Sequence, residues 1–347
     1  MDTEQISTEQ IDTNPQPIST DPISTDPIST ERILVSVPDH VLREALGELP
    51  DGVELIDWAM DGPAPVPEID LVVMPYMGAT RKLAHLSGVQ TRLVQSQAIG
   101  YDGAEAVLPA GNVLANAATV HEASTAELTL ALILAAQRGL PAFVRDAEAG
   151  RWSRPAPQYA SLADRTVLLL GYGGVSRAIE ARLLPFETTI VRVARTARSD
   201  ENGPIHAFGD LAQLLPQADI VVVAVPLTPE THHLVDDAFL TQMTDGALLV
   251  NIARGPVANT DALLAHAGSG RLRLALDVTD PEPLPDGHPL FALPNVLVTP
   301  HVGGASTAML PRMVRLLRAQ IERMQAGQEP LNVVLGGCAA TPVSTTD

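Results

Sequence analysis

One stretch constrains the fold of this chain more than any other, a glycine-rich turn that separates two apolar segments. Residues 167–170 form an apolar run typical of a strand buried on both faces, and residues 189–193 form a second. Between them, the turn at residues 171–174 opens a helical pattern over residues 175–184, which Pro185 ends. A strand, a glycine turn and a helix that lead into another strand form the unit that binds the pyrophosphate of a dinucleotide.

The residue types in this turn fit the chemistry of phosphate binding. Gly171 permits a tight turn and Gly173 lets the backbone approach a phosphate, while the helix start at Gly174 and Val175 presents free amide N–H groups to the anion. Ser176 stands where a third glycine is usual, and its small side chain still permits close packing of the helix against the strand. The motif in this context predicts a nucleotide site.

Charge and composition exclude several classes of partner. A net charge of −19 argues against nucleic acid and anionic membranes as partners. Cys338 is the only cysteine, so an internal disulfide is excluded and a reducing compartment is favoured. No apolar run reaches the ~18 residues of a membrane span, and the start lacks the pattern of a signal peptide. We therefore expect a cytoplasmic protein that binds neither nucleic acid nor membrane, and we find no metal-ligand spacing.

The alternation of segments predicts two folded units between two tails. The chain of 347 residues is long enough for two domains. Residues 1–32 repeat Ile-Ser-Thr among prolines and acids without apolar periodicity, which predicts a disordered tail, and we expect a second at residues 336–347. Four short apolar runs predict a small parallel α/β layer in the first unit, at residues 33–37, 71–74, 93–95 and 113–115.

The second unit continues the strand–helix alternation. With the two strands around the glycine turn, four more apolar runs predict a doubly wound parallel sheet of six or seven strands, at residues 220–225, 247–252, 274–277 and 296–299. Residues 124–127 read Ser-Thr-Ala-Glu, a capping-box pattern that predicts a helix over residues 128–138 broken by Pro141. Trp152 precedes the glycine turn, and we expect it to serve packing.

Four ionisable side chains follow strand ends in the second unit: Arg254, Asp277, Glu282 and His301. Because the carboxyl ends of parallel strands meet at one edge of a sheet, we expect them to converge on one cleft. A guanidinium can grip a carboxylate and polarise an adjacent carbonyl. A histidine held in one tautomer by a glutamate can protonate a carbonyl oxygen as a hydride reaches the carbon. Taken singly, Arg254 could instead cap a helix, and Glu282 could be a solvated loop carboxylate.

Several motifs in this order resemble the D-isomer-specific 2-hydroxyacid dehydrogenase family, over roughly residues 33–335. They are the glycine turn 171–176, residues 225–228 with Thr231, residues 251–255, residues 276–278 and 282–283, residues 288–290, and residues 299–304. The resemblance implies that Arg254 binds the substrate carboxylate, that His301 is the general acid/base and that Glu282 tunes it. A small 2-keto or 2-hydroxy acid would be the substrate.

The resemblance also implies further site residues. Met77 and Gly78 would hold the substrate carboxylate, and Asp277 with the backbone near Ala253 would orient the nicotinamide carboxamide. The remaining cofactor contacts expected from the family's pattern are Pro226, Thr231, Ile252 and Gly303.

The family's architecture implies a Rossmann cofactor domain at residues 118–304. A smaller flavodoxin-like substrate domain would comprise residues 33–117 and be completed by residues 305–335, including a helix at about residues 311–326. The resemblance also implies that the two domains hinge against each other and that a homodimer forms through the cofactor domain.

The end of the second strand of the glycine motif predicts which dinucleotide binds. NAD sites usually place Asp or Glu there to hold the ribose hydroxyls. Here Ala194 occupies that position and is followed by Arg195, Thr196 and Arg198. A pair of arginines with a hydroxyl favours a 2′-phosphate. Arginines that are only solvated at a strand end would give the same sequence pattern. We expect NADP(H) to be preferred over NAD(H).

Two other functions stay open on the same fold: a co-regulator that senses a dinucleotide, and a phosphite-type dehydrogenase. A sensor would favour loss of the Arg–Glu–His set, and all three residues are present. The formate dehydrogenase branch of the family has Gln where Glu282 stands, so formate is disfavoured as substrate.

Overall fold

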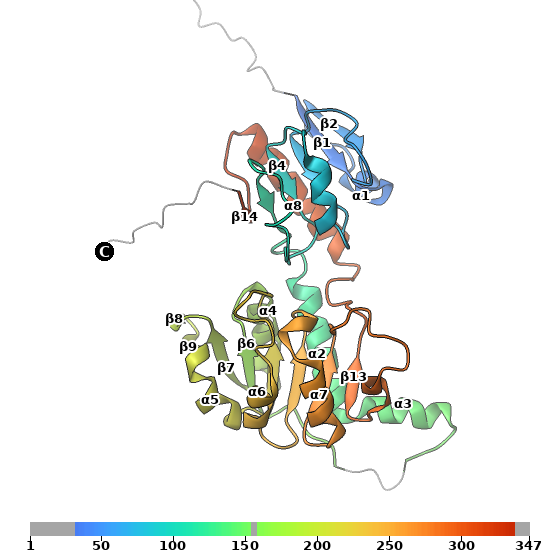
Figure 1. The fold of residues 1–347 in the computed structure, drawn as a ribbon, viewed down its shortest axis with the longest axis vertical. Coiled ribbons are helices and arrows are strands. Elements are labelled where there is room, and N and C mark those ends of the chain that lie inside the picture. The colour runs from blue at the N-terminus through green and yellow to red at the C-terminus, as the bar shows by residue number, and fades with distance from the viewer. Residues whose placement is uncertain (1–31, 154–157, 337–347) are drawn as a thin grey trace, which may run out of the picture.

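The protein, described by a computed structural model over residues 32–153 and 158–336, forms two α/β lobes (Figure 1). One lobe contains a six-stranded sheet and the other an eight-stranded sheet. Both predicted tails, apart from Arg32 and Gly336, lie outside the described residues, as does Cys338.

The smaller lobe has the strand order of a flavodoxin-like sheet, as predicted. Its order is β14-β5-β4-β3-β1-β2, with all neighbours parallel except the antiparallel pair of β14 and β5. The strands are β1 (Ile33–Val37), β2 (Val53–Asp57), β3 (Leu71–Val73), β4 (Leu93–Gln95), β5 (Leu114–Ala115) and β14 (Val333–Leu335). The sequence analysis missed β2 because this edge strand carries two exposed charged residues, Glu54 and Asp57, one on each face, which interrupt the apolar pattern.

The larger sheet is doubly wound, as predicted, but has eight strands rather than six or seven. Its order is β13-β12-β11-β10-β6-β7-β9-β8, and only β8 runs antiparallel to its neighbour. The strands are β6 (Thr166–Leu170), β7 (Thr189–Ala194), β8 (Arg198–Asp200), β9 (Gly203–Ala207), β10 (Ile220–Val223), β11 (Leu248–Asn251), β12 (Arg273–Leu276) and β13 (Val296–Val298). Strands β8 and β9 escaped prediction because they are short and polar, with Gly203 and Pro204 at the start of β9.

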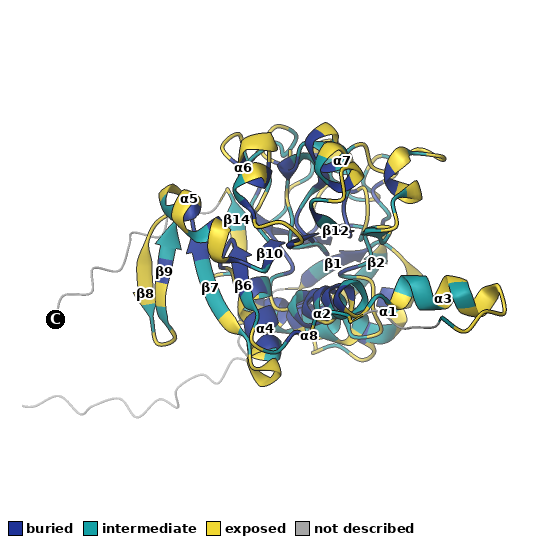
Figure 2. Cartoon of the chain, turned by 90° about the horizontal axis from the view of Figure 1, so that it is seen from below, coloured by how far each residue is buried: buried dark blue, intermediate teal, exposed yellow. Residues whose placement is uncertain are grey.

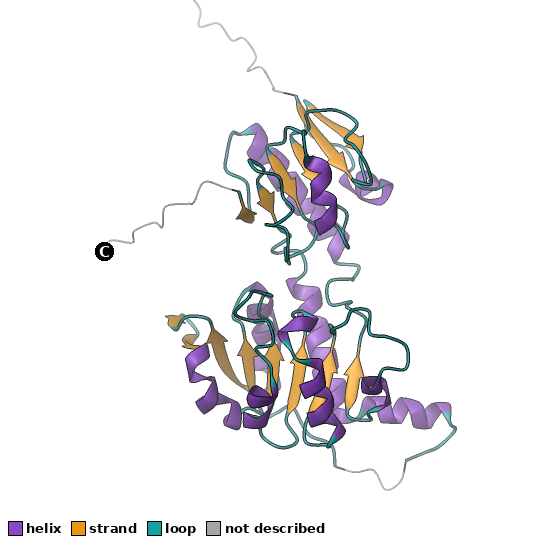
Figure 3. Cartoon of the chain, viewed as in Figure 1, coloured by secondary structure: helices purple, strands orange, loops and turns teal. Residues whose placement is uncertain are grey.

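Helices cover both faces of the larger sheet (Figure 3). Helices α2 (Glu122–Arg138) and α4 (Gly174–Leu183) pack on one face. On the other face lie α5 (Leu211–Leu214), α6 (Asp237–Gln242) and α7 (Thr260–Gly268). Figure 2 shows the central strands buried between these layers.

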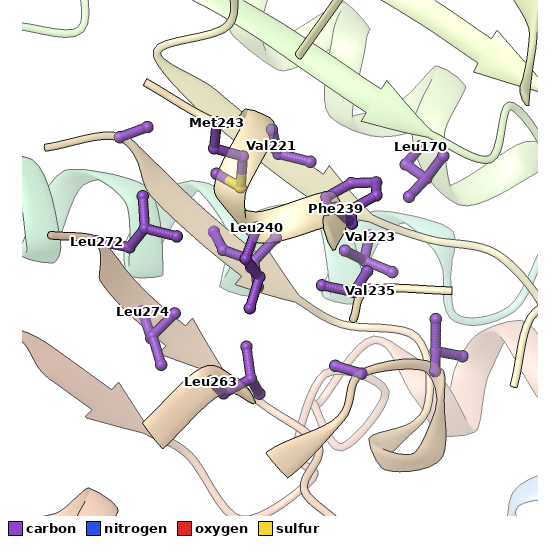
Figure 4. Close-up of a cluster of buried hydrophobic side chains, with 14 of the residues drawn as sticks. Leu170, Val221, Val223, Val235, Phe239, Leu240, Met243, Leu263, Leu272 and Leu274 are labelled. Carbon is purple, nitrogen blue, oxygen red and sulfur yellow. The ribbon is translucent and has the colours of Figure 1, made fainter. Parts of the chain in front are cut away.

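The alternation of side chains along each strand builds these two cores. Along β6, Val167 and Leu169 belong to the layer under α2 and α4, while Leu168 and Leu170 belong to the opposite layer. Figure 4 shows the latter, where Phe239 of α6 packs among strand side chains such as Leu170 and Val223. Burial on both faces explains why these strands are continuous apolar runs.

The chain crosses between the lobes twice. It first passes from β5 to the larger sheet, and then returns after β13 through α8 (Met309–Gln325), which packs with α1 (His40–Leu46) on the smaller sheet (Figure 1). The 3₁₀ helix η1 (Thr80–Leu86) contributes to the other face of that sheet. The carboxyl edges of both sheets therefore adjoin the crossing segments.

Three local predictions were wrong. Helix α2 begins at Glu122 after the N-cap residue His121, and the Ser124 hydroxyl bonds that of Ser306 at 2.5 Å instead of forming a capping box. Gly139, with φ of 64°, ends the helix, so Pro141 does not break it and instead lies in the first turn of α3 (Leu140–Glu148).

Trp152 is 81% exposed, which contradicts its predicted packing role. Within the described residues, no single helix is long and apolar enough to cross a membrane; only α2 and α3 taken together pass that test, and they are bent by 70°.

Candidate active site

The glycine turn lies between β6 and α4 and is open on its outer side. Gly171 has φ of 95°, and a Cβ there would lie 2.7 Å from the carbonyl oxygen of Ala224, so both backbone and space require glycine. Gly173 is exposed, and a Cβ there would meet nothing within 4 Å. The buried Ser176 hydroxyl donates to the Gly171 carbonyl, so the residue in place of a third glycine ties the helix to the turn.

A buried ionic network joins the turn to α4 and β7. The Tyr172 hydroxyl donates to Glu180, and Arg192 pairs with the same carboxylate. The side chains of Arg192 and Glu180 are only 11% and 4% exposed. Burial, and then the bond to Glu180, raise the pKa of Tyr172. Because the polar groups satisfy one another, the network holds the turn without leaving a buried charge unpaired.

A cleft of about 730 Å³ lies between the lobes, at the carboxyl edges of both sheets. Most of the predicted site residues line it: Met77, Gly78, Gly173, Gly174, Val175, Ser176, Pro226, Ile252, Ala253, Arg254, Asp277, Glu282, His301 and Gly303. The cleft therefore joins the glycine turn to the group of strand-end ionisable side chains.

Five predicted cofactor residues do not line this cleft. Gly171 is the buried first residue of the turn, and Thr231 is buried, where its hydroxyl donates to the Pro226 carbonyl at 2.6 Å. Arg198 donates to the carbonyl of Tyr172 at 3.1 Å. The last two, Arg195 and Thr196, are exposed beyond the end of β7.

Arg254 extends from the loop after β11 and contacts the other lobe. Its Nε donates to Asp102 Oδ2 at 2.7 Å, and its Nη1 donates to the carbonyl of Ala253 at 2.6 Å. A Cβ on Gly100 would lie 1.5 Å from Nη2, so a larger residue there would displace the guanidinium from this position. A Cβ on Gly255 would lie 1.8 Å from the carbonyl oxygen of Thr279, so glycine is also required directly after the arginine.

His301 and Glu282 form a close pair in the cleft. The distance between His301 Nδ1 and Glu282 Oε1 is 2.6 Å, and the two side chains are 32% and 40% exposed. With a proton on Nδ1 donated to the carboxylate, the Nε2 atom is available to a ligand. His301 has φ of 53°, an uncommon conformation for a residue other than glycine, and such conformations cluster at functional sites.

Asp277 fixes the loop that carries His301. This side chain is 2% exposed, and its Oδ1 accepts bonds from the Thr299 hydroxyl at 2.7 Å and the Val302 amide at 2.9 Å. Its Oδ2 accepts from the Gly303 amide at 2.9 Å, and its backbone carbonyl accepts from the His301 amide. The carboxylate predicted to orient a nicotinamide thus also anchors the histidine loop.

The smaller lobe supplies site residues that the sequence analysis did not name. His121 stacks on Tyr76 with ring centroids 5.5 Å apart, and its Nε2 lies 2.6 Å from the Gln97 carbonyl oxygen. Burial, and the charge of Asp277, raise the pKa of Tyr76. Asp102 follows β4 and His121 follows β5. Because the carboxyl ends of parallel strands meet at one edge of a sheet, the reasoning that placed Arg254 in the cleft applies to these two residues as well.

A second cavity, of about 280 Å³, lies at the opposite edge of the larger sheet. Its arginines donate to neighbouring groups: Arg165 to Asp219 at 2.7 Å, and Arg273 to the Gly246 carbonyl at 3.0 Å. We therefore do not assign a ligand to it. Among residues 32–153 and 158–336, no group of three or more His, Cys, Asp or Glu side chains is arranged to hold a metal ion.

Comparisons with known proteins agree with this geometry. The family model of the D-isomer specific 2-hydroxyacid dehydrogenase NAD binding domain matches residues 130–303. A glyoxylate reductase/hydroxypyruvate reductase of Mus musculus is 32% identical over 280 residues, which cover 76% of this chain and 85% of that protein.

Solved structures give the same result. A D-isomer specific 2-hydroxyacid dehydrogenase from Xanthobacter autotrophicus Py2, in complex with NADPH and MES, has a TM-score of 0.75 and 29% identity and covers 88% of this chain and 98% of its own. An NADPH-dependent glyoxylate/hydroxypyruvate reductase from Sinorhizobium meliloti, in complex with NADP and malonate, has a TM-score of 0.72 and 26% identity with the same coverage.

Proposed function

Because the chain belongs to the D-isomer-specific 2-hydroxyacid dehydrogenase family, we propose that it reduces small 2-keto acids such as glyoxylate or hydroxypyruvate with NADPH. Membership makes the chain an oxidoreductase with an NAD(P)-binding domain. The observation that carries the finer proposal is that Arg254 and the His301–Glu282 pair line one cleft with an open glycine turn.

We assign the cofactor domain to residues 118–304 and the substrate domain to residues 33–117 with 305–335. The two sheets support this division, because β6 to β13 form one sheet and β1 to β5 with β14 form the other.

The residues of the turn fit a dinucleotide. The open space above Gly173 and the free amides at the start of α4 suit a pyrophosphate, which Gly174 and Val175 would hold. Ile252, Ala253 and the Asp277 side chain line the neighbouring part of the cleft and would hold the nicotinamide end. The bound cofactor supplies a hydride to the carbonyl carbon of the keto acid.

The remaining steps belong to side chains of this chain. Arg254 holds the substrate carboxylate through Nη2 and the free hydrogen of Nη1, since Nε and the other Nη1 hydrogen are engaged. His301 gives the proton on Nε2 to the carbonyl oxygen, while Glu282 keeps the proton on Nδ1 in place. The products are the 2-hydroxy acid, which is the D-isomer where C2 is a stereocentre, and the oxidised cofactor. The partly exposed His301 regains its proton from solvent.

The preference for NADP(H) is supported by the residues after β7. Ala194 is buried and carries no carboxylate, and Arg195 and Thr196 are exposed beside it. We expect kcat/KM to be higher with NADPH than with NADH, and Arg195→Ala to lower that ratio. Arg315→Ala, which removes an exposed arginine of α8, is the matched control. A wild-type preference for NADH would contradict the assignment.

We also propose a cytoplasmic homodimer that forms through the cofactor domain. Helix α3 projects from the larger lobe without a buried residue, and it exposes Leu140 at 49% and Val144 at 56% (Figure 1). Exposed apolar side chains on a projecting helix favour association. Light scattering should give twice the chain mass, and a monomer at assay concentrations would contradict the proposal.

The experiment that tests the function follows nicotinamide absorbance with glyoxylate, hydroxypyruvate, pyruvate and phenylpyruvate. We expect NADPH oxidation with at least one of them. Cofactor binding without any turnover would instead favour a dinucleotide sensor, and reduction of NADP⁺ by phosphite would favour a phosphite-type dehydrogenase.

A further inference from the structure

We infer that Asp102 restricts the substrate to keto acids with a single negative charge, an inference that rests on the proposed function. Asp102 lies in the loop after β4 and reaches across the cleft to Arg254 of the other lobe, where Oδ2 accepts from Nε at 2.7 Å. Both side chains are 30% exposed, so the pair is part of the cleft wall and is only partly screened by water.

The cleft offers little positive charge to a substrate. Arg254 is the only arginine or lysine among the residues that line the described cleft. Its charge is already paired with Asp102, and its Nη2 lies beside Gly100, in the same loop as Asp102. One substrate carboxylate can bind the remaining guanidinium hydrogens, whereas a second one would find no further arginine or lysine in this lining.

Negatively charged side chains outnumber the single arginine in the described cleft. Asp102, Glu122, Asp277 and Glu282 all line the cleft. Glu122 Oε1 accepts from the Thr119 amide at 2.6 Å and its Oε2 is buried without a hydrogen-bond partner, so this carboxylate adds to the negative charge of the cleft. A second substrate carboxylate would therefore enter a site dominated by like charge.

Asp102 is the acid best placed to reject such a substrate. A small keto acid that binds Arg254 is close to Asp102 because both carboxylates share one guanidinium. Any second carboxylate on that molecule then lies within about 10 Å of Asp102, where one partly screened like charge changes binding by about tenfold or more. Asp277 is instead occupied by the histidine loop, and Glu282 by His301.

The test compares two isosteric substrates, the dianion oxaloacetate and its neutral-side-chain amide 2-oxosuccinamate. We expect wild type to have the higher kcat/KM for the amide. Asp102→Asn, which keeps the size of the side chain, should move the ratio toward oxaloacetate by about tenfold or more. Glu105→Gln removes an exposed carboxylate from the same loop and should leave the ratio unchanged.

A ratio of two substrates is insensitive to a general loss of folded enzyme, which affects both alike. An unchanged ratio in Asp102→Asn, with reduction of the amide or of glyoxylate retained, would overturn the role of Asp102 and leave the proposed function standing. Equal kcat/KM of wild type for oxaloacetate and 2-oxosuccinamate would also overturn the role of Asp102 and leave the proposed function standing. Absence of keto acid reduction by wild type would overturn both proposals.

Discussion

Replacement of Asp277 by Asn should both destabilise the larger lobe and misplace His301. The carboxylate accepts three bonds in a site that is 2% exposed, two on Oδ1 from Thr299 and Val302 and one on Oδ2 from Gly303. An amide nitrogen cannot accept the third bond, so the Gly303 N–H is left without its acceptor. Loss of one charge-assisted bond and weakening of two others amounts to about 3–4 kcal/mol.

The assay measures thermal unfolding together with steady-state reduction of glyoxylate by Asp277→Asn. We expect Tm to fall by about 6 °C or more, and kcat to fall by about 10²-fold because the loop no longer fixes His301. Asp286→Asn, at an exposed loop carboxylate, is the matched control and should behave as wild type. Wild-type Tm and kcat in Asp277→Asn would refute the anchoring role.

Two further predictions follow from the geometry. Gly255→Ala should cost about 3 kcal/mol of stability or prevent folding, because its Cβ would lie 1.8 Å from the Thr279 carbonyl oxygen. The control variant Gly209→Ala should be tolerated, because a Cβ there would meet nothing within 4 Å. Equal thermal unfolding of the two variants would contradict this steric reasoning. Tyr172 has a pKa raised above its ordinary value of 10.0 by burial and Glu180, so its contribution to stability is fully present below about pH 10 and is lost as pH rises through the folded-state pKa. Ultraviolet titration should show two late-ionising tyrosines in wild type, Tyr76 and Tyr172, and one fewer in Tyr172→Phe. The same number of late-ionising tyrosines in both proteins would be inconsistent with the burial of Tyr172.

The part of the fold that depends on apolar periodicity was predictable from the sequence. Strands such as β6 and β10 are buried on both faces, so each is a continuous apolar run with clear ends. Edge strands β2 and β8 have no buried residue and carry exposed charged side chains, so their sequences resemble loops. Helix α2 began earlier than predicted because contacts with distant residues, such as the bond between Ser124 and Ser306, decide the role of its serine.

The same contrast applies to the site. Arg254, Asp277, Glu282 and His301 were expected in one cleft because strand topology alone brings strand ends together, and the structure places all four in its lining. The pairing of Arg254 with Asp102 joins residues 152 positions apart on different sheets, so no local pattern reports it. The role of Arg198 at a 2′-phosphate stays a prediction. Its bond to the Tyr172 carbonyl depends on the β8 hairpin, which the sequence analysis did not predict.

The central claim is that His301 donates the proton during reduction of a keto acid bound at Arg254. The most direct measurement is kcat for glyoxylate reduction by His301→Ala, together with the Kd for NADPH measured by fluorescence. We expect kcat to fall by about 10²–10⁴-fold while the Kd for NADPH stays at the wild-type value. Near-normal turnover in His301→Ala would contradict it.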